Sequence, residues 1–469
     1  MLPELCLLGS AVVALLLGMV VNAKLVCRLL VASMGAVVLL AFLDFIHHAE
    51  DVSLFNSFLL HTQCTRASRV MVGMAGFLSL FLYLCAGSKL RYEFPVVAMF
   101  AVLGAMLLVQ TNHFLSFYLS FELIGIPSCI MVCFNRDSKR SSEAAVKFFI
   151  LGALTSCIML YGTSLLYGYS PGLGCEIVRK VSEGGASLGA SLGCVFIVVG
   201  VLFKLSAVPF HMWAVDTYQG SPTAALAFFF MVIKTAMTLL LAQIIGGNQA
   251  LTESFATMFV CVGGLSTIVG ELGALRQSCI KRLLAYSNIG HLGYVLPVIV
   301  LKGTSSYAIF QYIFTYWIIN AWTLSVLLRY KDDGPELTDL TGMCKNNPFV
   351  AFSLVASMIS AAGVPPFPGF FAKYSLLKSI AMSGLPAAVA FPYVLFLCVA
   401  GIVPCFYCFR IAKVVYFDQP VGARAKYLTE LPHSLGLSAV AVACALLSII
   451  ALFSAKYFDI LLSRGGPFA

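Results

Sequence analysis

The chain has 469 residues, of which 60% are hydrophobic and only 10% are charged, whereas a typical soluble domain is about 25% charged. This composition excludes a soluble globular protein. Apolar stretches of roughly 20 residues recur along the whole chain, and each can cross the ~30 Å hydrocarbon core of a bilayer as a helix. Composition therefore predicts an all-α, polytopic membrane protein with little chain left for a soluble domain.

The 29 Lys and Arg residues outnumber the 20 Asp and Glu residues and give a net charge of +9. They are spread over short loops rather than gathered in one basic stripe, which indicates membrane topology and not a nucleic-acid partner. The 16 cysteines lie mostly in apolar runs, and the one CxxC, Cys405 and Cys408, is expected to pack rather than bind metal. The amino end, Met1–Glu4, has no basic segment, so we expect a retained first span and not a cleaved leader.

Fourteen apolar stretches, separated by polar residues or by glycine and proline, are predicted to be membrane-spanning helices. In chain order they cover residues 5–21, 26–46, 68–87, 93–110, 113–134, 144–168, 188–210, 222–246, 254–273, 280–301, 304–329, 348–381, 386–415 and 434–462.

Two of these stretches contain prolines in mid-run. The seventh carries Pro209 five residues after Lys204, and the twelfth carries the segment GVPPFPG at residues 363–369. Because proline lacks a backbone donor and clashes with the preceding turn, both spans are predicted to be broken there. Broken helices at membrane depth persist only where protein or water satisfies the freed backbone groups.

The basic residues of the loops predict the orientation. If the amino end faces away from the cytoplasm, seventeen loop Lys and Arg residues lie on the cytoplasmic side and seven on the other side. Since basic loops are retained on the cytoplasmic side, both termini are expected to be non-cytoplasmic, or to face away from the matrix in an organelle.

The spacing of 169 residues from Glu122 to His291 recurs between Lys204 and Lys373, which hints at an internal duplication. Spans four to eight would correspond to spans nine to thirteen. Because each copy holds five helices, an odd number, the copies would be inverted in the membrane, as in many secondary transporters. The chain then divides into residues 1–110 with spans one to four, 93–246 as the first repeat opened by span four, 254–415 as the second repeat, and 416–469 as a loop and the last span.

Charged side chains inside the apolar stretches are the most informative about function. A lysine at the bilayer centre costs about 2.5–3.5 kcal/mol, and intramembrane ionisable groups usually mark ion pathways. Glu122 lies deep in the fifth span with Lys204 as its expected partner, Lys234 lies near the middle of the eighth span, and Lys373 follows Pro368 in the twelfth. The alternatives are a static ion pair for Glu122 and packing roles for the lysines.

Four further residues carry weaker signals. Lys147 lies near the cytoplasmic end of its span and either relays protons or extends its ammonium to the headgroups, and the same extension is expected for Lys378. His211 and His291 are either proton relays or hydrogen-bonded core histidines. The sequence shows no motif for haem, an iron–sulfur cluster or a nucleotide, so we expect no cofactor and no metal in this chain.

Several motifs resemble those of one membrane-protein family. They are FEL at 121–123, NRDSKRSSEAAVK at 135–147, FKLSAVPFHMW at 203–213, YQGSPT at 218–223, KRLLAYS at 281–287 and GVPPFPGFFAK at 363–373. Together they resemble the N-type antiporter-like membrane subunits of NADH:quinone oxidoreductase, or respiratory complex I, whose mitochondrial counterpart is subunit 2. The resemblance covers roughly residues 66–415.

The resemblance implies about fourteen transmembrane helices with two inverted five-helix repeats and broken helices 7 and 12. By matching motifs, it assigns proton translocation to Glu122, Lys147, Lys204, Lys234 and Lys373. It favours the N type, because M-type subunits usually carry glutamate at the position of Lys373 and L-type subunits carry a long lateral helix. Val215 and Asn288 depart from the residues common in the family, proline and serine.

The resemblance also implies a non-redox subunit of an enzyme complex in the bacterial inner membrane or, alternatively, the mitochondrial inner membrane. FMN, iron–sulfur clusters and quinone are expected in partner subunits, and M-type, L-type and small membrane subunits are the expected neighbours within the lipid bilayer. One alternative is a subunit of a multi-subunit cation/proton antiporter or membrane-bound hydrogenase. Another is a scaffold bundle without transport.

Overall fold

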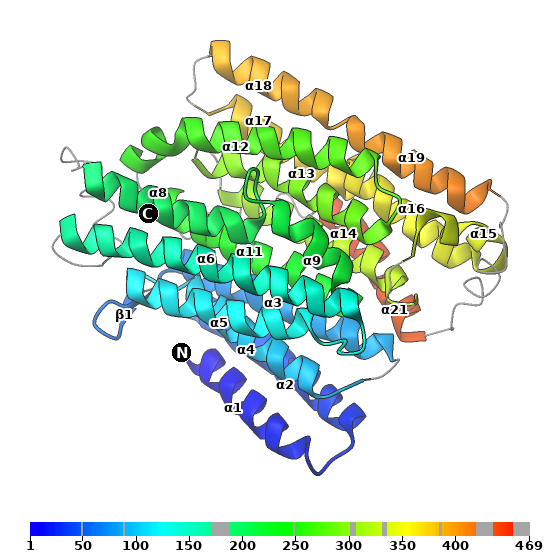
Figure 1. Cartoon of the computed structure of the whole chain (residues 1–469), viewed down its shortest axis with the longest axis horizontal. Coiled ribbons are helices and arrows are strands. Elements are labelled where there is room, and N and C mark those ends of the chain that lie inside the picture. The colour runs from blue at the N-terminus through cyan, green and yellow to red at the C-terminus, as the bar shows by residue number, and fades with distance from the viewer. Residues whose placement is uncertain are drawn as a thin grey trace.

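A computed structural model describes residues 1–47, 50–87, 90–169, 174, 188–246, 249–300, 306–330, 335–383, 387–418 and 435–453. Helices run side by side in alternating directions, from the amino-terminal helices at one edge to α18 and α19 at the other (Figure 1). The all-α prediction is confirmed apart from one small hairpin. Most of the predicted segment 416–469 and the end of its last span lie outside the described residues.

The amino-terminal part consists of four helices and a hairpin that the sequence analysis did not anticipate. The helices are α1 (Leu2–Leu17), α2 (Ala23–His47), α3 (Gln63–Ala86) and α4 (Glu93–Leu108). Strands β1 (Val52–Leu54) and β2 (Leu59–His61) pair antiparallel before α3.

Two arginines counted as loop residues in the orientation analysis, Arg66 and Arg69, are instead buried in the first turns of α3. Arg69 forms ion pairs with Glu4 at 2.8 Å and with Asp44 at 2.7 Å. The segment was predicted to start at residue 68 because its first turn is polar. Glu4 on α1, which is buried, and Asp44 on α2, which is partly buried, satisfy that polarity. These charges therefore join the first three helices to one another.

The next group of helices contains the first predicted break. Its elements are α5 (Phe114–Val132), α6 (Lys139–Tyr169), α8 (Leu188–Leu205), α9 (Met212–Gly220), α10 (Thr223–Phe228), the π-helix η1 (Phe229–Ile233) and α11 (Lys234–Gly246). The seventh span is broken between α8 and α9, as predicted, at a segment that contains Ser206 with a φ of 62° and Pro209. The π-helical turn in the eighth span was not predicted.

The remaining helices contain the second break. They are α12 (Gln249–Leu275), α13 (Ile280–Val300), α14 (Ser306–Leu327), the 3₁₀ turn η2 (Leu337–Leu340), α15 (Met343–Asn346), α16 (Pro348–Ala362), α17 (Pro368–Ala381), α18 (Ala387–Ala400), α19 (Val403–Tyr416) and α21 (Leu435–Phe453). The twelfth span is broken between α16 and α17 at the predicted prolines. The thirteenth, predicted to be continuous, divides into α18 and α19 just before Pro404.

Within the described residues, nine helices are long and apolar enough to span a membrane, and four shorter apolar helices accompany them. The chain is a multi-pass membrane protein, and the count of fourteen spans stays a prediction. The span Thr223–Ile245 is 100% buried within the chain and Ile280–Val300 is 94% buried, whereas Ala23–His47 is only 28% buried. The segments η1, α11 and α13 therefore form the centre around which the other helices pack.

Candidate functional site

Three of the buried lysines in the helical bundle, Lys204, Lys234 and Lys373, lie beside an interruption of a regular helix. Lys204 precedes the first break, Lys234 follows the π-helical turn, and Lys373 follows the second break. Their exposed fractions are 3%, 3% and 7%. Lys204 lies before the break in its span, whereas Lys373 lies after the break in its span. The spacing of 169 residues therefore does not place the two lysines at equivalent positions relative to the breaks.

Glu122 of α5 lies next to Lys204, with Gly125 between them. A Cβ atom on Gly125 would be 3.2 Å from Lys204 Nζ and 3.8 Å from Glu122 Oε2. The two charges interact electrostatically, yet in the described part of the chain they form no direct ion pair. The Lys204 ammonium instead lies over the rings of Phe121 and Phe148, at 4.8 and 5.2 Å from their centroids. The expected partners are therefore close neighbours and not a locked pair.

Glu122 lies at the lateral face of the chain and is only half-buried, although the sequence suggested a deep carboxylate. Ser156 of α6 donates a hydrogen bond to its Oε1. Around it, Leu119 and Ile126 are 60% and 61% exposed. Depth in a membrane and burial within one chain are separate quantities, because a lateral residue can be covered by lipid or by a neighbouring subunit.

Lys147 of α6 is partly exposed, unlike the other lysines predicted to translocate protons. Its side chain is 43% exposed and forms ion pairs with Glu143 at 2.7 Å and with Asp216 of α9 at 3.1 Å. Asp216 was not predicted, because its pairing with Lys147 depends on how α9 packs along α6. Lys147 is thus held directly by carboxylates, unlike Lys204, Lys234 and Lys373.

Aromatic rings fill the space between Lys204 and Lys234. Phe148 contacts Phe229 with centroids 5.5 Å apart, and Phe229 and Phe230 of η1 lie 5.5 and 5.2 Å from Tyr218. Lys234 Nζ lies 5.8 Å from the centroid of Phe230. Within the described residues, no chain of hydrogen bonds joins the two lysines, so the aromatic cluster separates them.

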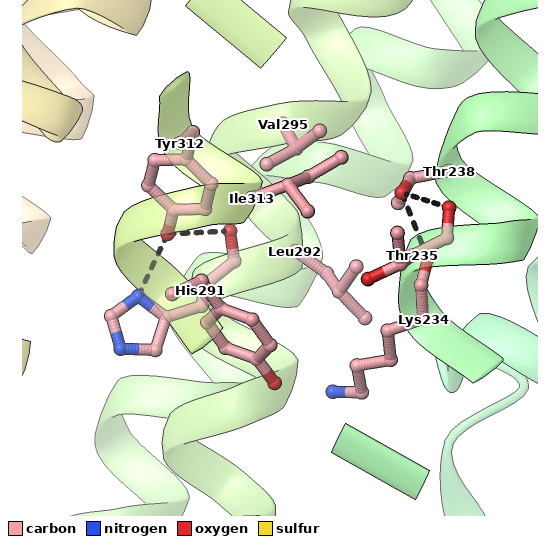
Figure 2. A pocket seen from close by; sticks show the side chains of 9 residues that line it. Lys234, Thr235, Thr238, His291, Leu292, Val295, Tyr312 and Ile313 are labelled. Carbon is pink, nitrogen blue, oxygen red and sulfur yellow. Dashed lines mark hydrogen bonds between the residues drawn. The ribbon is translucent and has the colours of Figure 1, made fainter. Parts of the chain in front are cut away.

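Lys234 extends into a small cavity of about 20 Å³ lined by α11, α13 and α14. Figure 2 shows its side chain reaching from α11 towards the α13 side, where His291 and Tyr312 form the opposite wall. Its Nζ donates to the backbone oxygen of Asn288 at 3.1 Å. A cavity of roughly 10–15 Å³ already accommodates one water, so this space is large enough for a water beside the ammonium.

Helix α13 carries a row of polar side chains past this cavity. The Asn288 Oδ1 accepts from Tyr316 at 2.8 Å, and His291 Nδ1 lies 2.8 Å from the Tyr312 hydroxyl. The hydroxyl of Tyr312 also donates to the backbone oxygen of His291, as Figure 2 shows. His291 is therefore hydrogen-bonded in the core and also lines the cavity that contains Lys234, so both interpretations of this histidine fit its position.

Lys373 lies beside a second set of polar groups. Its Nζ donates to the backbone oxygen of Ala362 at 2.9 Å, a carbonyl at the end of α16 that the break leaves without a helical partner. Glu271 of α12, which the sequence analysis did not single out, is 2% exposed and accepts a hydrogen bond from Tyr407 of α19 at 3.3 Å. The signal that could have identified it is a glutamate inside the apolar stretch 254–273, which contains no Lys or Arg.

Three other singled-out residues, His211, Val215 and Lys378, lie away from these contacts. His211 is buried at the start of α9, and its Nδ1 has no hydrogen-bond partner among the described residues. Val215 is 4% exposed within α9, and Lys378 is exposed on α17, where its ammonium is free to reach the headgroups. Cys405 and Cys408 are free thiols, and no group of three or more His, Cys, Asp or Glu side chains that could hold a metal occurs in the described ranges.

The sequence matches the family model described as NADH:quinone oxidoreductase/Mrp antiporter, TM, over residues 111–399. The chain belongs to this family. It is 64% identical to NADH-quinone oxidoreductase subunit N of Anaplasma marginale (strain Florida), over 98% of this chain and 96% of that protein. It is 47% identical to NADH-quinone oxidoreductase subunit N of Anaplasma phagocytophilum (strain HZ), over 96% of each.

The fold is similar to that of solved membrane complexes. It matches a chain of respiratory complex I from Thermus thermophilus with bound aureothin at a TM-score of 0.83 and 25% identity, covering 99% of this chain and 100% of that one. A chain of the Mrp complex from Dietzia sp. DQ12-45-1b has a TM-score of 0.83 at 19% identity, covering 99% and 95%. The predicted family is therefore confirmed, and since the antiporter shares the fold, sequence identity and not fold separates the two functions.

Proposed function

We propose that the chain is a proton-translocating membrane-arm subunit of NADH:quinone oxidoreductase. Its similarity to subunit N proteins supports the complex. The observation that carries transport is the set of three buried lysines beside interrupted helices, because such lysines are costly in a bilayer and are retained where ions move. The chain itself acts without a redox cofactor, and FMN, iron–sulfur clusters and quinone belong to partner subunits.

Translocation begins at Glu122 and Lys204. An ionised Glu122 favours the charged form of Lys204, so a change in their separation changes how readily the lysine gives up its proton. The absence of a direct ion pair supports this role. A small change in the distance between Glu122 and Lys204, which lie on either side of Gly125, changes their electrostatic interaction strongly. Lys147, paired with Asp216, supplies protons or tunes the local charge at the cytoplasmic end of α6.

The proton then crosses the aromatic cluster to Lys234. The π-helical turn η1 places Phe229 and Phe230 in this position, and π-bulges often occur at functional sites. A transient water chain past Tyr218 would connect the lysines, and its absence at other times would prevent leakage. From Lys234 the proton passes along the polar row of α13, with His291 as one relay, to Lys373.

Both termini face away from the cytoplasm in this proposal, and Lys373 delivers the proton to that side of a bacterial inner membrane. The larger number of basic residues in the opposite loops supports this orientation. Cysteine labelling at Leu2 checks it in the assembled complex. Modification only from the cytoplasmic side would reverse the orientation and the direction of the path.

Other membrane subunits of the same complex are the partners. The half-buried Glu122 and the half-exposed Lys147 lie on one lateral face, among apolar residues of α5 and α6. Lipid alone would leave a carboxylate at hydrocarbon depth poorly solvated. A neighbouring antiporter-like or small membrane subunit therefore covers this face.

The decisive experiment replaces Lys373 in the assembled complex. Lys373→Met should reduce proton pumping at unchanged complex content, because the side chain can no longer take up a proton. Lys373→Arg should not restore full pumping, since arginine keeps its proton with a pKa above about 12. Pumping per NADH equal to wild type in Lys373→Met would refute the relay, and absence of the chain from a complex with NADH dehydrogenase activity would favour the cation/proton antiporter.

A further inference from the structure

Glu271 is a buried carboxylate that the path described above does not use. It lies in α12, close to the end of that helix at Leu275, and its exposed fraction is 2%. Buried carboxylates in membrane helices are rare, and those present usually face a pathway or an opposite charge. The groups around Glu271 come from four other helices, α13, α14, α17 and α19.

Gly290 of α13 makes room for the carboxylate. A Cβ atom at this position would lie 2.7 Å from Glu271 Oε1 and 3.0 Å from its Cδ. One residue earlier in α12, a Cβ on Gly270 would lie 2.3 Å from the Gly290 nitrogen, so the two helices touch backbone to backbone. The Glu271 carboxylate therefore lies against the backbone of α13 in the space that the missing side chain of Gly290 leaves.

The two carboxylate oxygens of Glu271 differ in their surroundings. Oε2 accepts the hydrogen bond from Tyr407, whose hydroxyl also lies 3.1 Å from the Ser287 hydroxyl. Oε1 has no hydrogen-bond partner among the described residues. A buried carboxylate oxygen without a hydrogen-bond partner is unfavourable, and either a bridging water or conversion to the neutral acid lowers that cost. The hydrogen bond from Tyr407 thus holds Oε2 in place, whereas Oε1 is available to accept a proton or a hydrogen bond from water.

Lys373 is the positive charge that faces this carboxylate. The two interact electrostatically, but no direct ion pair joins them in the part of the chain that the structure describes. The ammonium uses one N–H on the Ala362 carbonyl and lies 5.1 Å from the centroid of the Tyr294 ring. Lys147 differs, because carboxylates at 2.7 and 3.1 Å hold it directly.

The other ionisable groups near Glu271 are neutral at ordinary pH. Tyr294, Tyr312, Tyr407 and Cys408 all interact electrostatically with it. Phenols and thiols ordinarily titrate near pH 10 and pH 8.5, so they provide dipoles but no countercharge near pH 7. Lys373 is therefore the charged group in the described surroundings that can exchange a proton with this carboxylate.

We propose that Glu271 is a proton-relay residue in the second half of the path, within residues 254–415. Glu271 exchanges a proton with Lys373, and Tyr407 positions the Glu271 carboxylate. This inference rests on the proposed function. An N–H bond of the Lys373 ammonium breaks and an O–H bond forms at Glu271 Oε1, directly or across one water, and no electron moves. A charged amine and carboxylate become a neutral amine and acid, so the net charge of the buried site does not change. Protonation of the amine from Lys234 and release of the carboxyl proton complete the cycle.

The test compares Glu271→Gln, Glu271→Asp and Lys373→Met in membranes that contain the assembled complex. Glu271→Gln should reduce proton pumping per NADH by about tenfold or more, a threshold set below the ~10²–10⁴-fold contribution of a positioned acid or base. Glu271→Asp should recover a large part of it, because the charge remains. The double variant Glu271→Gln with Lys373→Met should be within about twofold of the worse single variant, since residues in one unit are not additive.

Glu4→Gln is the control, because Glu4 is also a buried glutamate but is ion-paired with Arg69 and lies in α1, away from the proposed path. It should reduce the amount of complex while pumping per assembled complex stays at the wild-type level. Gly290→Ala should displace the Glu271 carboxylate and reduce pumping with the glutamate still present.

Infrared difference spectra provide a readout that a purely structural role would not change. A carboxylic C=O band should appear during turnover, disappear in Glu271→Gln and shift in Glu271→Asp. Wild-type pumping in Glu271→Gln, together with a loss in Lys373→Met, would overturn this inference alone. Wild-type pumping in both variants would overturn the proposed function itself.

Discussion

The two halves of the proposed path differ in how the chain surrounds their charged side chains. The first half contains Glu122, Lys147 and Lys204, and the second contains Lys373 and Glu271. In the first half, Glu122 and Lys147 lie on a lateral face, and Lys147 is fixed by Glu143 and Asp216. In the second half, Lys373 and Glu271 are buried and interact without a direct ion pair. Direct ion pairs hold protons in place, whereas separated charges can exchange them through water. The comparison indicates that the second half is complete within this chain and that the first half depends on a neighbour.

The largest effect is expected for Glu122 and Lys204, which should behave as one unit. Glu122→Gln removes the charge that favours protonated Lys204, and Glu122→Asp keeps it, so the first should greatly reduce pumping and coupled quinone reduction while the second retains much more. The double variant Glu122→Gln with Lys204→Met should be scarcely worse than either single change. Proton pumping and NADH oxidation should be measured at matched complex content. Additive losses would show that the two residues act independently.

A smaller effect is expected at the polar row of α13. Tyr316→Phe removes the donor to Asn288 Oδ1 and leaves that buried oxygen without its partner, which should destabilise the complex by about 1–3 kcal/mol. The midpoint of thermal inactivation should therefore decrease. Tyr161→Phe is the control, because Tyr161 is 59% exposed on α6. Equal midpoints for the two variants would mean that the row contributes no stability.

The smallest effect on stability is expected for Lys147→Met. Exposed ion pairs contribute about 0.2–1 kcal/mol each, and the pairs to Glu143 and Asp216 are partly exposed. The amount of assembled complex should stay near wild type, as measured on native gels, while pumping decreases less than in Lys373→Met. Glu143→Gln serves as the control, since Asp216 still holds the lysine. A pumping loss as severe as that of Lys373→Met would remove the distinction between the two halves.

The sequence by itself predicted the apolar helices of a multi-pass membrane protein and the places where two spans are broken. Hydropathy predicts the spans, because apolar segments enter hydrocarbon as helices that satisfy their own backbone hydrogen bonds. Proline predicts the breaks, because it removes a backbone donor from the helix. The lysines were also visible, since a lysine in an apolar run is rare whatever its neighbours are. The break inside the thirteenth span was missed, because Gly401 and Pro404 there lacked the repeated prolines of the twelfth.

Only the tertiary structure decided which of these charges meet. Asp216 reaches Lys147 because α9 packs along α6, and the Glu271 carboxylate fits where α12 and α13 touch because Gly290 has no side chain. The sequence places Glu122 at depth, yet burial within the chain depends on helices that pack beside α5, and there the described helices leave it half-exposed. Hydropathy acts along the chain, but pairing of charges depends on contacts between helices far apart in sequence, which no local pattern encodes.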